Sequence, residues 1–439
     1  MSARRAGGLL GGATRAFAAR AAGTGLAFCV GLAVTRTLGP AGAGVYFLAV
    51  TMTSIASVVG RLGLDHLLVR RVAAALEQGD HGRLQAASRF GPALALFGSG
   101  AMALALFAAA PAIEARVFRL EGLASALRCA AFAVAPLSLV ALRGELLRGL
   151  ARTGASQLVQ FALPAAGTLC FLAAAFPAFG RTPAAAAGAY AASAAVAALL
   201  AGLLWRRATP WLAGVAPKGG ARELARSALP FLGVSVLALL LSWISTLALA
   251  LRGDDADVGV FSVAYRTATL SSFFLIAVNS AAAPRFAALA ARRDLLSLAR
   301  AARRATLLTT ACALPVVAAA WIFPSEIMAL FGPGFAAGGR ALAILAAGQL
   351  VNVATGPVGE LLLMSGHEGA LRRGLLASTA LSIVLHAALV PRGGLEGAAL
   401  ANAITLAALN LGALVLVRRN LAIDVLQLPR FLVQRHPEV

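Results

Sequence analysis

Long apolar segments alternate with short polar connections along almost the whole chain. Each segment has roughly 18–25 residues, the length that an α-helix needs to cross about 30 Å of hydrocarbon. A transmembrane β-barrel would show segments of about ten residues with alternating apolar and polar positions, and the sequence has no such pattern. The pattern therefore predicts an all-α polytopic membrane protein. Twelve transmembrane spans are expected, at residues 14–36, 42–60, 89–110, 124–142, 157–179, 184–204, 227–250, 258–282, 305–324, 339–363, 374–391 and 394–417.

The second and the eighth expected spans carry a similar motif. The stretch "AGAGVYFLAVTMTSI", from Ala41, aligns without a gap with "ADVGVFSVAYRTATL", from Ala256, and the alignment pairs Gly44 with Gly259. Each motif lies in the second span of a half that has six spans. An even number of spans makes the halves parallel repeats, related by an axis along the membrane normal. The sequence therefore predicts two parallel six-helix lobes around a central cavity.

This plan divides the chain into five parts. We expect an N-terminal segment at residues 1–13, an N-terminal lobe at 14–204, a basic linker at 205–226, a C-terminal lobe at 227–417 and a C-terminal tail at 418–439.

The basic residues add an orientation. Of the 38 Lys and Arg residues, 28 fall in connections on the side of the N-terminus and 7 on the other side. Connections rich in Lys and Arg stay in the cytoplasm, so both termini and the linker are expected there. The net charge of +21 does not favour binding to nucleic acid, because the charges lie between apolar segments rather than in one patch.

No cofactor and no metal ion are expected. The four cysteines lie in or beside apolar segments without CxxC spacing, which favours packing over a metal site or a disulfide. Lys218 is not preceded by the Gly-rich pattern of a P-loop, which argues against an ATP-driven machine within this chain.

The N-terminus resembles a signal peptide, but Arg15 and Arg20 interrupt its apolar part, so an uncleaved cytoplasmic end is expected.

Several motifs resemble those of bacterial polysaccharide flippases, in the same order along the chain. In the first half they are "LAVTRTLGPAGAGVYFLAV" and "RLGLDHLLVRRVAA". In the second half they are "LFGPGFAAGGRALAILAAGQLVNVATGPVGELLLMSGHEG" and "GLEGAALANAIT". The likeness extends from about residue 10 to residue 420. The same superfamily holds the lipid II flippases and the multidrug and toxin extrusion transporters.

The resemblance implies a function as well as a fold. It implies a twelve-helix, two-lobed transporter in the bacterial cytoplasmic membrane, whose lobes rock to give alternating access. Its substrate would be an oligosaccharide on polyprenyl diphosphate, moved from the inner to the outer leaflet for O-antigen, capsule or exopolysaccharide synthesis. Its partners would be membrane lipids and, further on, a polysaccharide polymerase and assembly proteins. It would be a transporter rather than an enzyme.

Arg266 is the first candidate for contact with such a substrate. It lies in "AYRTATL", about two turns below the outer end of a span that holds no acidic residue. An arginine inside a membrane is by default a functional hypothesis, and guanidinium pairs with phosphate oxygens through two parallel hydrogen bonds. The alternative is an arginine that reaches the membrane surface or pairs with carbonyl groups. The corresponding span of lipid II flippases also resembles "AYRTATL", with an arginine that faces the cavity.

Further candidates carry open alternatives. Arg20 and Arg128 lie close enough to span ends to reach the surface, and Arg61 is followed after one helical turn by Asp65, a spacing typical of an ion pair. Asn279 and Asn352 could bind sugar hydroxyls or simply join helices.

Three groups could take part in proton coupling. These are Glu360, Asp65 and His386, and for each the alternative is a satisfied polar residue in a helix contact.

Two other functions compete with the flippase. A cation-coupled multidrug exporter of the same superfamily would need carboxylates in its cavity, whereas the charges within the spans are mostly basic. A membrane-embedded glycosyltransferase or polymerase could use the acids of "RGDDADVG", but a short solvated turn explains Asp254, Asp255 and Asp257 better.

Overall fold

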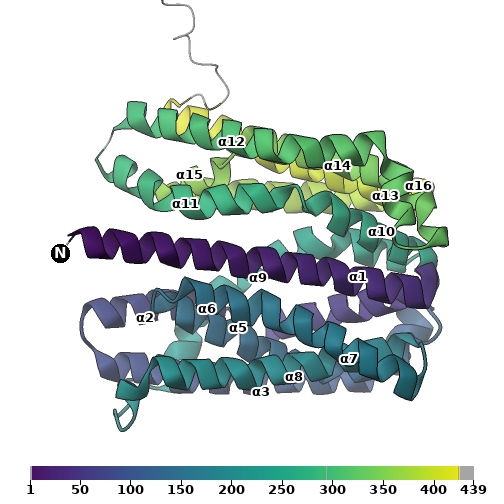
Figure 1. Cartoon of the computed structure of the whole chain (residues 1–439), viewed down its shortest axis with the longest axis horizontal. Coiled ribbons are helices and arrows are strands. Elements are labelled where there is room, and N and C mark those ends of the chain that lie inside the picture. The colour runs from purple at the N-terminus through teal and green to yellow at the C-terminus, as the bar shows by residue number, and fades with distance from the viewer. Residues whose placement is uncertain (1, 293, 424, 426–439) are drawn as a thin grey trace, which may run out of the picture.

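A computed structural model describes residues 2–292, 294–423 and 425 (Figure 1). Every element in these ranges is a helix, which confirms the predicted all-α class. Eight helices are long and apolar enough to cross a membrane, or up to ten if each of two bent helix pairs counts as one span. The predicted number of twelve therefore stays a prediction.

The first half of the chain forms eight α-helices and three shorter helical turns. They are α1 (Ser2–Gly60), α2 (Leu64–Glu77), α3 (His81–Ala112), η1 (Ile113–Phe118), α4 (Leu123–Ala131), α5 (Val134–Gly149), α6 (Thr153–Gln157), η2 (Leu158–Ala162), α7 (Leu163–Phe179), α8 (Pro183–Ala208) and η3 (Pro210–Leu212).

The second half also consists of helices, but the breaks between its helices fall at different points. Its elements are α9 (Ala221–Ala250), α10 (Asp255–Thr269), α11 (Ser272–Ala291), α12 (Leu295–Ile322), α13 (Pro324–Ala329), η4 (Pro333–Gly338), α14 (Gly339–Thr355), α15 (Val358–Met364) and α16 (Glu368–Leu421).

The two longest helices, α1 and α16, are kinked. The backbone of α1 leaves the helical region at Gly39, directly before Pro40, and that of α16 does so at Gly394. Both glycines have positive φ angles, 69° and 49°, which residues with a Cβ rarely adopt. With 59 and 54 residues, each helix is about twice as long as one span requires. Each kink falls where the sequence predicts a turn between two spans.

Other expected spans contain breaks that the apolar pattern does not predict. The pairs α4–α5 and α10–α11 are each bent by 45°. Between α14 and α15 the chain turns at Gly356, whose φ is 70° and where a Cβ would lie 2.0 Å from the Thr306 hydroxyl oxygen. The expected spans at 124–142, 258–282 and 339–363 thus each contain a bend or a turn. The apolar pattern runs on through each break, so hydropathy alone does not reveal it.

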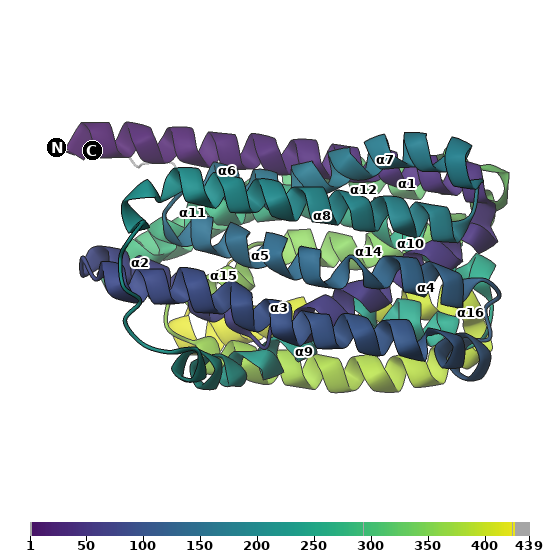
Figure 2. The same ribbon diagram turned by 90° about the horizontal axis from the view of Figure 1, so that it is seen from below.

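The long helices lie side by side, and Figure 1 shows one group of them on each side of α1. In Figure 2 the N-terminal part of helix α1 lies along one edge of the bundle. We call the end with the N-terminus of α1 and the α2–α3 and α11–α12 turns the inner end, after the predicted topology. The opposite end, with the kinks of α1 and α16, is the outer end.

The two lobes share one hydrophobic cluster at the outer end. It joins Phe47 and Leu48 of α1 to Phe261 of α10 and Phe335 of η4. At the inner end each lobe has a cluster of its own. One holds Leu68, and the other holds residues of α11, α12, α15 and α16. The lobes therefore meet at the outer end and separate towards the inner end.

Helix α9 does not follow the predicted lobe boundary along its whole length. Its first turns, at Leu224 and Ala228, pack into the inner cluster of the N-terminal lobe. Its last residues, Leu249 and Ala250, belong to the shared outer cluster. The helix thus connects the lobes diagonally.

The closest contact between the lobes is a crossing of α1 and α10 at two glycines. A Cβ on Gly44 would lie 1.8 Å from the carbonyl oxygen of Asp255, and a Cβ on Gly259 would lie 2.1 Å from that of Pro40. Only glycine lets these backbones approach so closely. Gly44 and Gly259 are the residues that the sequence repeat pairs, so equivalent points of the two halves touch each other.

Candidate functional site

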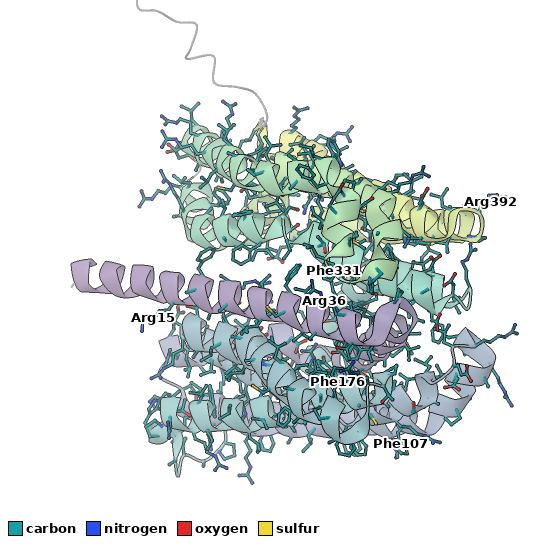
Figure 3. All side chains as sticks on the ribbon, turned by 45° about the vertical axis from the view of Figure 1, so that its right-hand side comes forward. Arg15, Arg36, Phe107, Phe176, Phe331 and Arg392 are labelled. Carbon is teal, nitrogen blue, oxygen red and sulfur yellow. The ribbon has the colours of Figure 1, made fainter. Side chains whose placement is uncertain are left out.

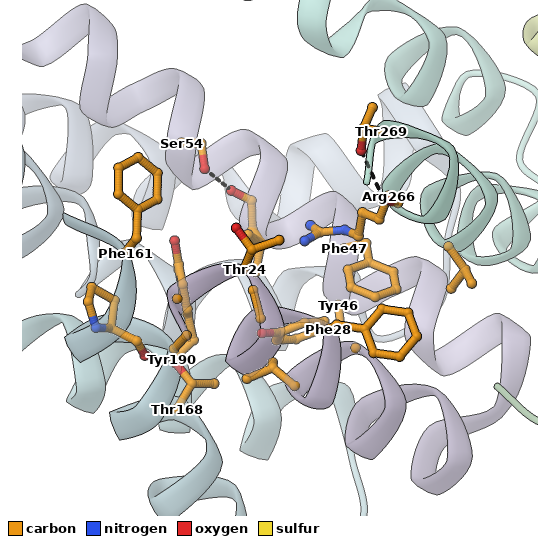
Figure 4. A pocket seen from close by; sticks show the side chains of 18 of the residues that line it. Thr24, Phe28, Tyr46, Phe47, Ser54, Phe161, Thr168, Tyr190, Arg266 and Thr269 are labelled. Carbon is orange, nitrogen blue, oxygen red and sulfur yellow. Dashed lines mark hydrogen bonds between the residues drawn. The ribbon is translucent and has the colours of Figure 1, made fainter. Parts of the chain in front are cut away.

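A cavity of about 430 Å³ lies between the lobes. Its walls come from α1, η2, α7, α8, α9 and α10, with Phe331 beside them (Figure 4). Most of the lining is apolar or aromatic, and among its residues Arg266 carries the only formal charge. The polar and aromatic side chains of the lining are Thr24, Phe28, Tyr46, Phe47, Ser54, Gln160, Phe161, Thr168, Tyr190, Trp243, Arg266, Thr269 and Phe331.

Arg266 points into this cavity from the last turn of α10 (Figure 4). It lies about three turns from the start of α10, deeper than the predicted two turns, because the helix already begins at Asp255. The guanidinium lies over the ring of Phe47 in the other lobe, with Cζ 4.7 Å from the ring centroid. The side chain is enclosed by protein, yet it keeps accessible surface because the cavity opens beside it.

Among the described residues, no acid forms an ion pair with this guanidinium. Its polar neighbours include the phenol groups of Tyr46 and Tyr190, which are uncharged at neutral pH. The cavity therefore presents a free positive charge near the middle of the bundle, among aromatic rings.

Arg20 lies beside the same cavity, nearer the inner end of α1. Its Cζ is 4.3 Å from the centroid of the Phe161 ring, and its Nη1 donates a hydrogen bond of 3.2 Å to Gln157 Oε1. Phe161 and Thr24, one helical turn after Arg20, both line the cavity. The prediction that Arg20 takes part in the site thus agrees with its position, although its function stays a prediction.

A π-helical turn, η2, shapes this side of the cavity. A Cβ on Gly23 would lie 2.7 Å from Cβ of Phe161, so this glycine lets α1 approach η2. The turn also presents Gln160, whose Nε2 donates to Ser156 Oγ at 3.0 Å and to Glu145 Oε1 at 3.4 Å. Short π-helical segments are frequent at functional sites.

Gln160 connects the cavity to a group of charged side chains within the N-terminal lobe. Glu145 accepts from Gln160 and pairs with Arg148 at 2.8 Å. Asp65 pairs with Arg61 at 3.5 Å, and the two side chains are only 19% and 13% exposed. The predicted alternative for Arg61, an ion pair one turn apart, is therefore what the structure shows. Sequence reasoning missed Glu145 and Gln160, since nothing in "LVQFA" reveals what the glutamine faces.

Arg128 lies away from the cavity. Its guanidinium is exposed and lies 5.6 Å from the ring centroid of Phe107. Phe107 is itself 39% exposed, on the outside of the N-terminal lobe (Figure 3). This position fits an arginine that reaches towards the membrane surface, and we do not include Arg128 in the site.

Asn352 joins two helices instead of lining the cavity. Its Nδ2 donates to Ser272 Oγ and to Gln349 Oε1, both at 3.1 Å. Ser272 in turn donates to Gln349 Oε1 at 2.5 Å. These bonds hold α11 to α14 directly after the break between α10 and α11.

His386 is buried in a separate network between α9 and α16. Its Nδ1 lies 2.7 Å from the carbonyl oxygen of Ser382, which can only accept, so Nδ1 carries a proton. Its Nε2 lies 2.7 Å from Ser245 Oγ, which also accepts a hydrogen bond from Asn402 Nδ2 at 3.2 Å. The Ser245 hydroxyl is thus directed to donate to a neutral imidazole. His386 has all its hydrogen bonds within the protein.

The last two candidates lie in the inner half of the C-terminal lobe. Asn279 is half-buried in α11, and its Oδ1 has no hydrogen-bond partner among the described residues. Glu360 is half-buried in the first turn of α15. Neither lines the central cavity. In the described ranges, no group of three His, Cys, Asp or Glu residues could hold a metal ion.

Fold and cavity together define a class: helical membrane proteins of two lobes with a cavity between them. A multidrug resistance MATE transporter of the MOP superfamily, in an inward-facing conformation, has this fold with a TM-score of 0.73 and 17% identity. That comparison covers 91% of this chain and 94% of the transporter. The lipid II flippase MurJ, in an inward closed conformation, is equally similar, with a TM-score of 0.73, 12% identity and coverage of 93% and 87%.

The sequence identifies the family. The model of the polysaccharide biosynthesis protein family matches residues 10–290, more than half of the chain, and the chain belongs to this family. The MatE model matches residues 230–391. A probable flippase, AglR of Haloferax volcanii, is 26% identical over 183 residues, which is 40% of this chain. The matched region spans 37% of that relative's length.

Proposed function

We propose that the protein is a flippase. It moves an oligosaccharide carried on polyprenyl diphosphate from the inner to the outer leaflet of the bacterial cytoplasmic membrane, for the synthesis of a surface polysaccharide. The observation that carries this proposal is Arg266, a cation without an acidic partner in a cavity between two lobes. Family membership and the flippase relative support the same substrate class.

The chemistry of the substrate explains the free charge. A diphosphate is anionic, and its transfer through hydrocarbon is costly unless the charge is paired. The Arg266 guanidinium supplies that partner through two parallel N–H···O bonds. Arg20, nearer the inner end, is placed to meet the diphosphate first. Aromatic residues such as Tyr190 and Trp243 then offer flat faces to the sugar rings.

Alternating access would use the contrast between the two ends of the bundle. With the lobes joined at the outer end and apart towards the inner end, the cavity is suited to receive substrate from the inner leaflet. Release would require the Gly44–Gly259 crossing to part. Of the three candidate coupling groups, Asp65 is the one whose charged neighbours reach the cavity lining, through Glu145 and Gln160.

The rival functions have weaker support. The MatE match and the MATE fold favour a multidrug exporter, but a positive charge in the cavity would repel a lipophilic cation. For a glycosyltransferase, the acids of "RGDDADVG" would have to form a site. Instead, Asp254 caps α10 by accepting the backbone N–H of Asp257 at 3.0 Å.

Flipping by purified protein in proteoliposomes tests the proposal. The substrate is a fluorescent oligosaccharide on polyprenyl diphosphate, and the measurement is the fraction that becomes accessible on the opposite side. Arg266→Ala should abolish flipping without loss of folded protein, and Arg266→Lys should restore part of it, because ammonium lacks the guanidinium fork. Arg128→Ala, which removes an arginine outside the cavity, is the matched control and should flip like wild type. Full flipping by Arg266→Ala would refute the proposed site, and transport of a lipophilic cation instead would assign the chain to the exporters.

A further inference from the structure

A second hollow lies away from the central cavity, between α11 and α12. It is a groove of about 360 Å³ in the inner half of the C-terminal lobe. Its walls include Val278, Ala282, Phe286 and Leu308, and Arg285 and Arg304 also line it. Phe286 is 1% exposed and packs into the inner cluster of this lobe, so the groove has a firm floor.

The charged and the apolar residues of the groove lie at different distances from the inner end. Arg285 lies about 9 Å from the inner end of α11 at Ala291, and Arg304 about 14 Å from the inner end of α12 at Leu295. Both arginines fall just outside the apolar stretches that the sequence marks as spans, at the level expected for lipid headgroups. The apolar wall residues Val278 and Leu308 lie deeper. Leu308 is 56% exposed, which opens the groove to the hydrocarbon of the bilayer.

The two arginines keep their charge available. Among the ion pairs between described residues, none involves Arg285 or Arg304, and both side chains are exposed. Elsewhere at the inner end, arginines such as Arg71 and Arg83 have acidic partners. The groove therefore combines two free cations at its mouth with an apolar floor behind them.

We propose that this groove binds an anionic phospholipid of the inner leaflet. Its phosphate lies between Arg285 and Arg304, where each guanidinium can donate two parallel hydrogen bonds to phosphate oxygens. One acyl chain lies along Val278, Ala282 and Leu308. Basic pockets between membrane helices on the cytoplasmic side favour such lipids over zwitterionic ones, which carry no net negative charge. This site is separate from the central cavity and does not depend on the proposed transport function.

Thermal unfolding of the full-length protein in detergent tests the site, with phosphatidylglycerol and phosphatidylcholine as the added lipids. A lipid that binds only the folded state raises Tm, and the increase grows with the logarithm of one plus the ratio of the lipid concentration to Kd. Phosphatidylglycerol should raise Tm of the wild type, and phosphatidylcholine should not. In the double variant Arg285→Gln/Arg304→Gln, affinity for phosphatidylglycerol should fall about fivefold for each arginine removed.

A matched control separates the groove from general surface charge. Arg292→Gln/Arg300→Gln removes two charges at the inner ends of the same helices, outside the groove lining, and should keep the wild-type response. If both double variants lose the same affinity for phosphatidylglycerol, the effect comes from surface charge in general and the proposal is overturned. The proposal is also overturned if the wild type responds equally to the two lipids. Polyprenyl diphosphate is the third probe. If it displaces phosphatidylglycerol from the wild type and no longer binds to the groove variant, the groove is a binding site for the transported lipid instead. A groove variant too unstable to assay is replaced by Arg285→Lys/Arg304→Lys, which keeps the charge and should retain most of the preference for phosphatidylglycerol.

Discussion

At the outer end the lobes share one hydrophobic cluster and touch through glycines, whereas at the inner end each lobe has its own cluster and many charged side chains. The outer contact depends on the close fit of apolar and small residues, and the described residues form few strong polar bonds between the lobes there. One exception is Arg36, whose Nε donates to the carbonyl oxygen of Leu330 across the lobes at 2.9 Å.

The inner end is held together differently. There, ion pairs such as Arg71–Glu223 (3.1 Å) and Lys218–Asp80 (3.3 Å) join neighbouring segments at the surface. Small residues let the backbones pack closely by van der Waals contact at the outer end, so this contact depends mainly on shape apart from the Arg36–Leu330 hydrogen bond. At the inner end, ion pairs at the surface take the place of a shared hydrophobic cluster. Four predictions would break or sharpen this contrast.

The largest effect is expected at the outer seal. Gly44→Ala places a methyl group 1.8 Å from the Asp255 carbonyl oxygen, so the crossing cannot form as it stands. Overpacking of about 1–3 kcal/mol should lower flipping about tenfold or more and leave the outer end open. A cysteine placed near the crossing should then react with an external thiol reagent. Gly188→Ala is the matched control, because a Cβ at Gly188 meets nothing within 4 Å, and it should behave like wild type. A sealed, active Gly44→Ala protein would show that the crossing is not the seal.

The second prediction compares a shielded ion pair with an exposed one. Asp65→Asn leaves the Arg61 guanidinium, 13% exposed, without its carboxylate and should destabilise the fold by about 1–3 kcal/mol. Glu223→Gln removes a partner that is 61% exposed, and Arg71 keeps its bond to Ser227 Oγ, so the cost should be below about 1 kcal/mol. Thermal unfolding of both variants measures the difference. Equal costs would mean that the Arg61–Asp65 pair is as well hydrated as the surface pair.

The third prediction concerns the link from the cavity to the charged residues. Gln160→Leu removes the amide that bonds both Ser156 and Glu145 and lines the cavity. Substrate affinity should fall about tenfold, since a buried hydrogen-bonding group is worth about 1–1.5 kcal/mol, while Tm changes little. The apparent KM for flipping reports the affinity. A drop in Tm with unchanged KM would assign Gln160 a structural role only.

The smallest effect is expected from pH at the inner end. Asp80 caps α3 by accepting the Arg83 backbone N–H at 3.0 Å, and this bond, together with Lys218, holds the pKa of Asp80 below its usual value. A lowered pKa stabilises the fold at pH values above the usual Asp pKa, and the contribution disappears as pH falls through the lowered pKa. Asp80→Asn keeps a good cap but cannot titrate, so its unfolding should lose a small part of the acid sensitivity of the wild type. An identical pH profile for the two proteins would contradict this assignment.

The sequence was sufficient for the broad architecture and for the most informative residue. Hydropathy identifies the all-α membrane class, and the aligned motifs pair Gly44 with Gly259, which the structure brings into contact. Arg266 stands out because a charge within an apolar span is costly and thus conspicuous. Its position over the Phe47 ring could not be inferred, because that ring comes from the other lobe.

Three features could not be predicted: the breaks in the helices, the side of each helix that faces the cavity, and the contacts between residues far apart in the sequence. Hydropathy does not report backbone geometry, so the bends before Val134 and Ser272 were missed. Arg128 was a candidate because of its depth, but depth says nothing about which side of a helix faces the cavity. Glu145 escaped notice because its partner Gln160 lies on another helix, and no local pattern connects them.

The crossing of Gly44 and Gly259 has a further consequence, for symmetry. Each glycine meets the backbone around its own counterpart, as in the isologous interface of a homodimer, although both belong to one chain. The symmetry between the two halves is broken at the position of Arg266. The equivalent residue in the first half is Thr51, which is 1% exposed. The charge in the cavity lining therefore comes from the second half of the chain, although the two halves contribute equivalent glycines to the crossing.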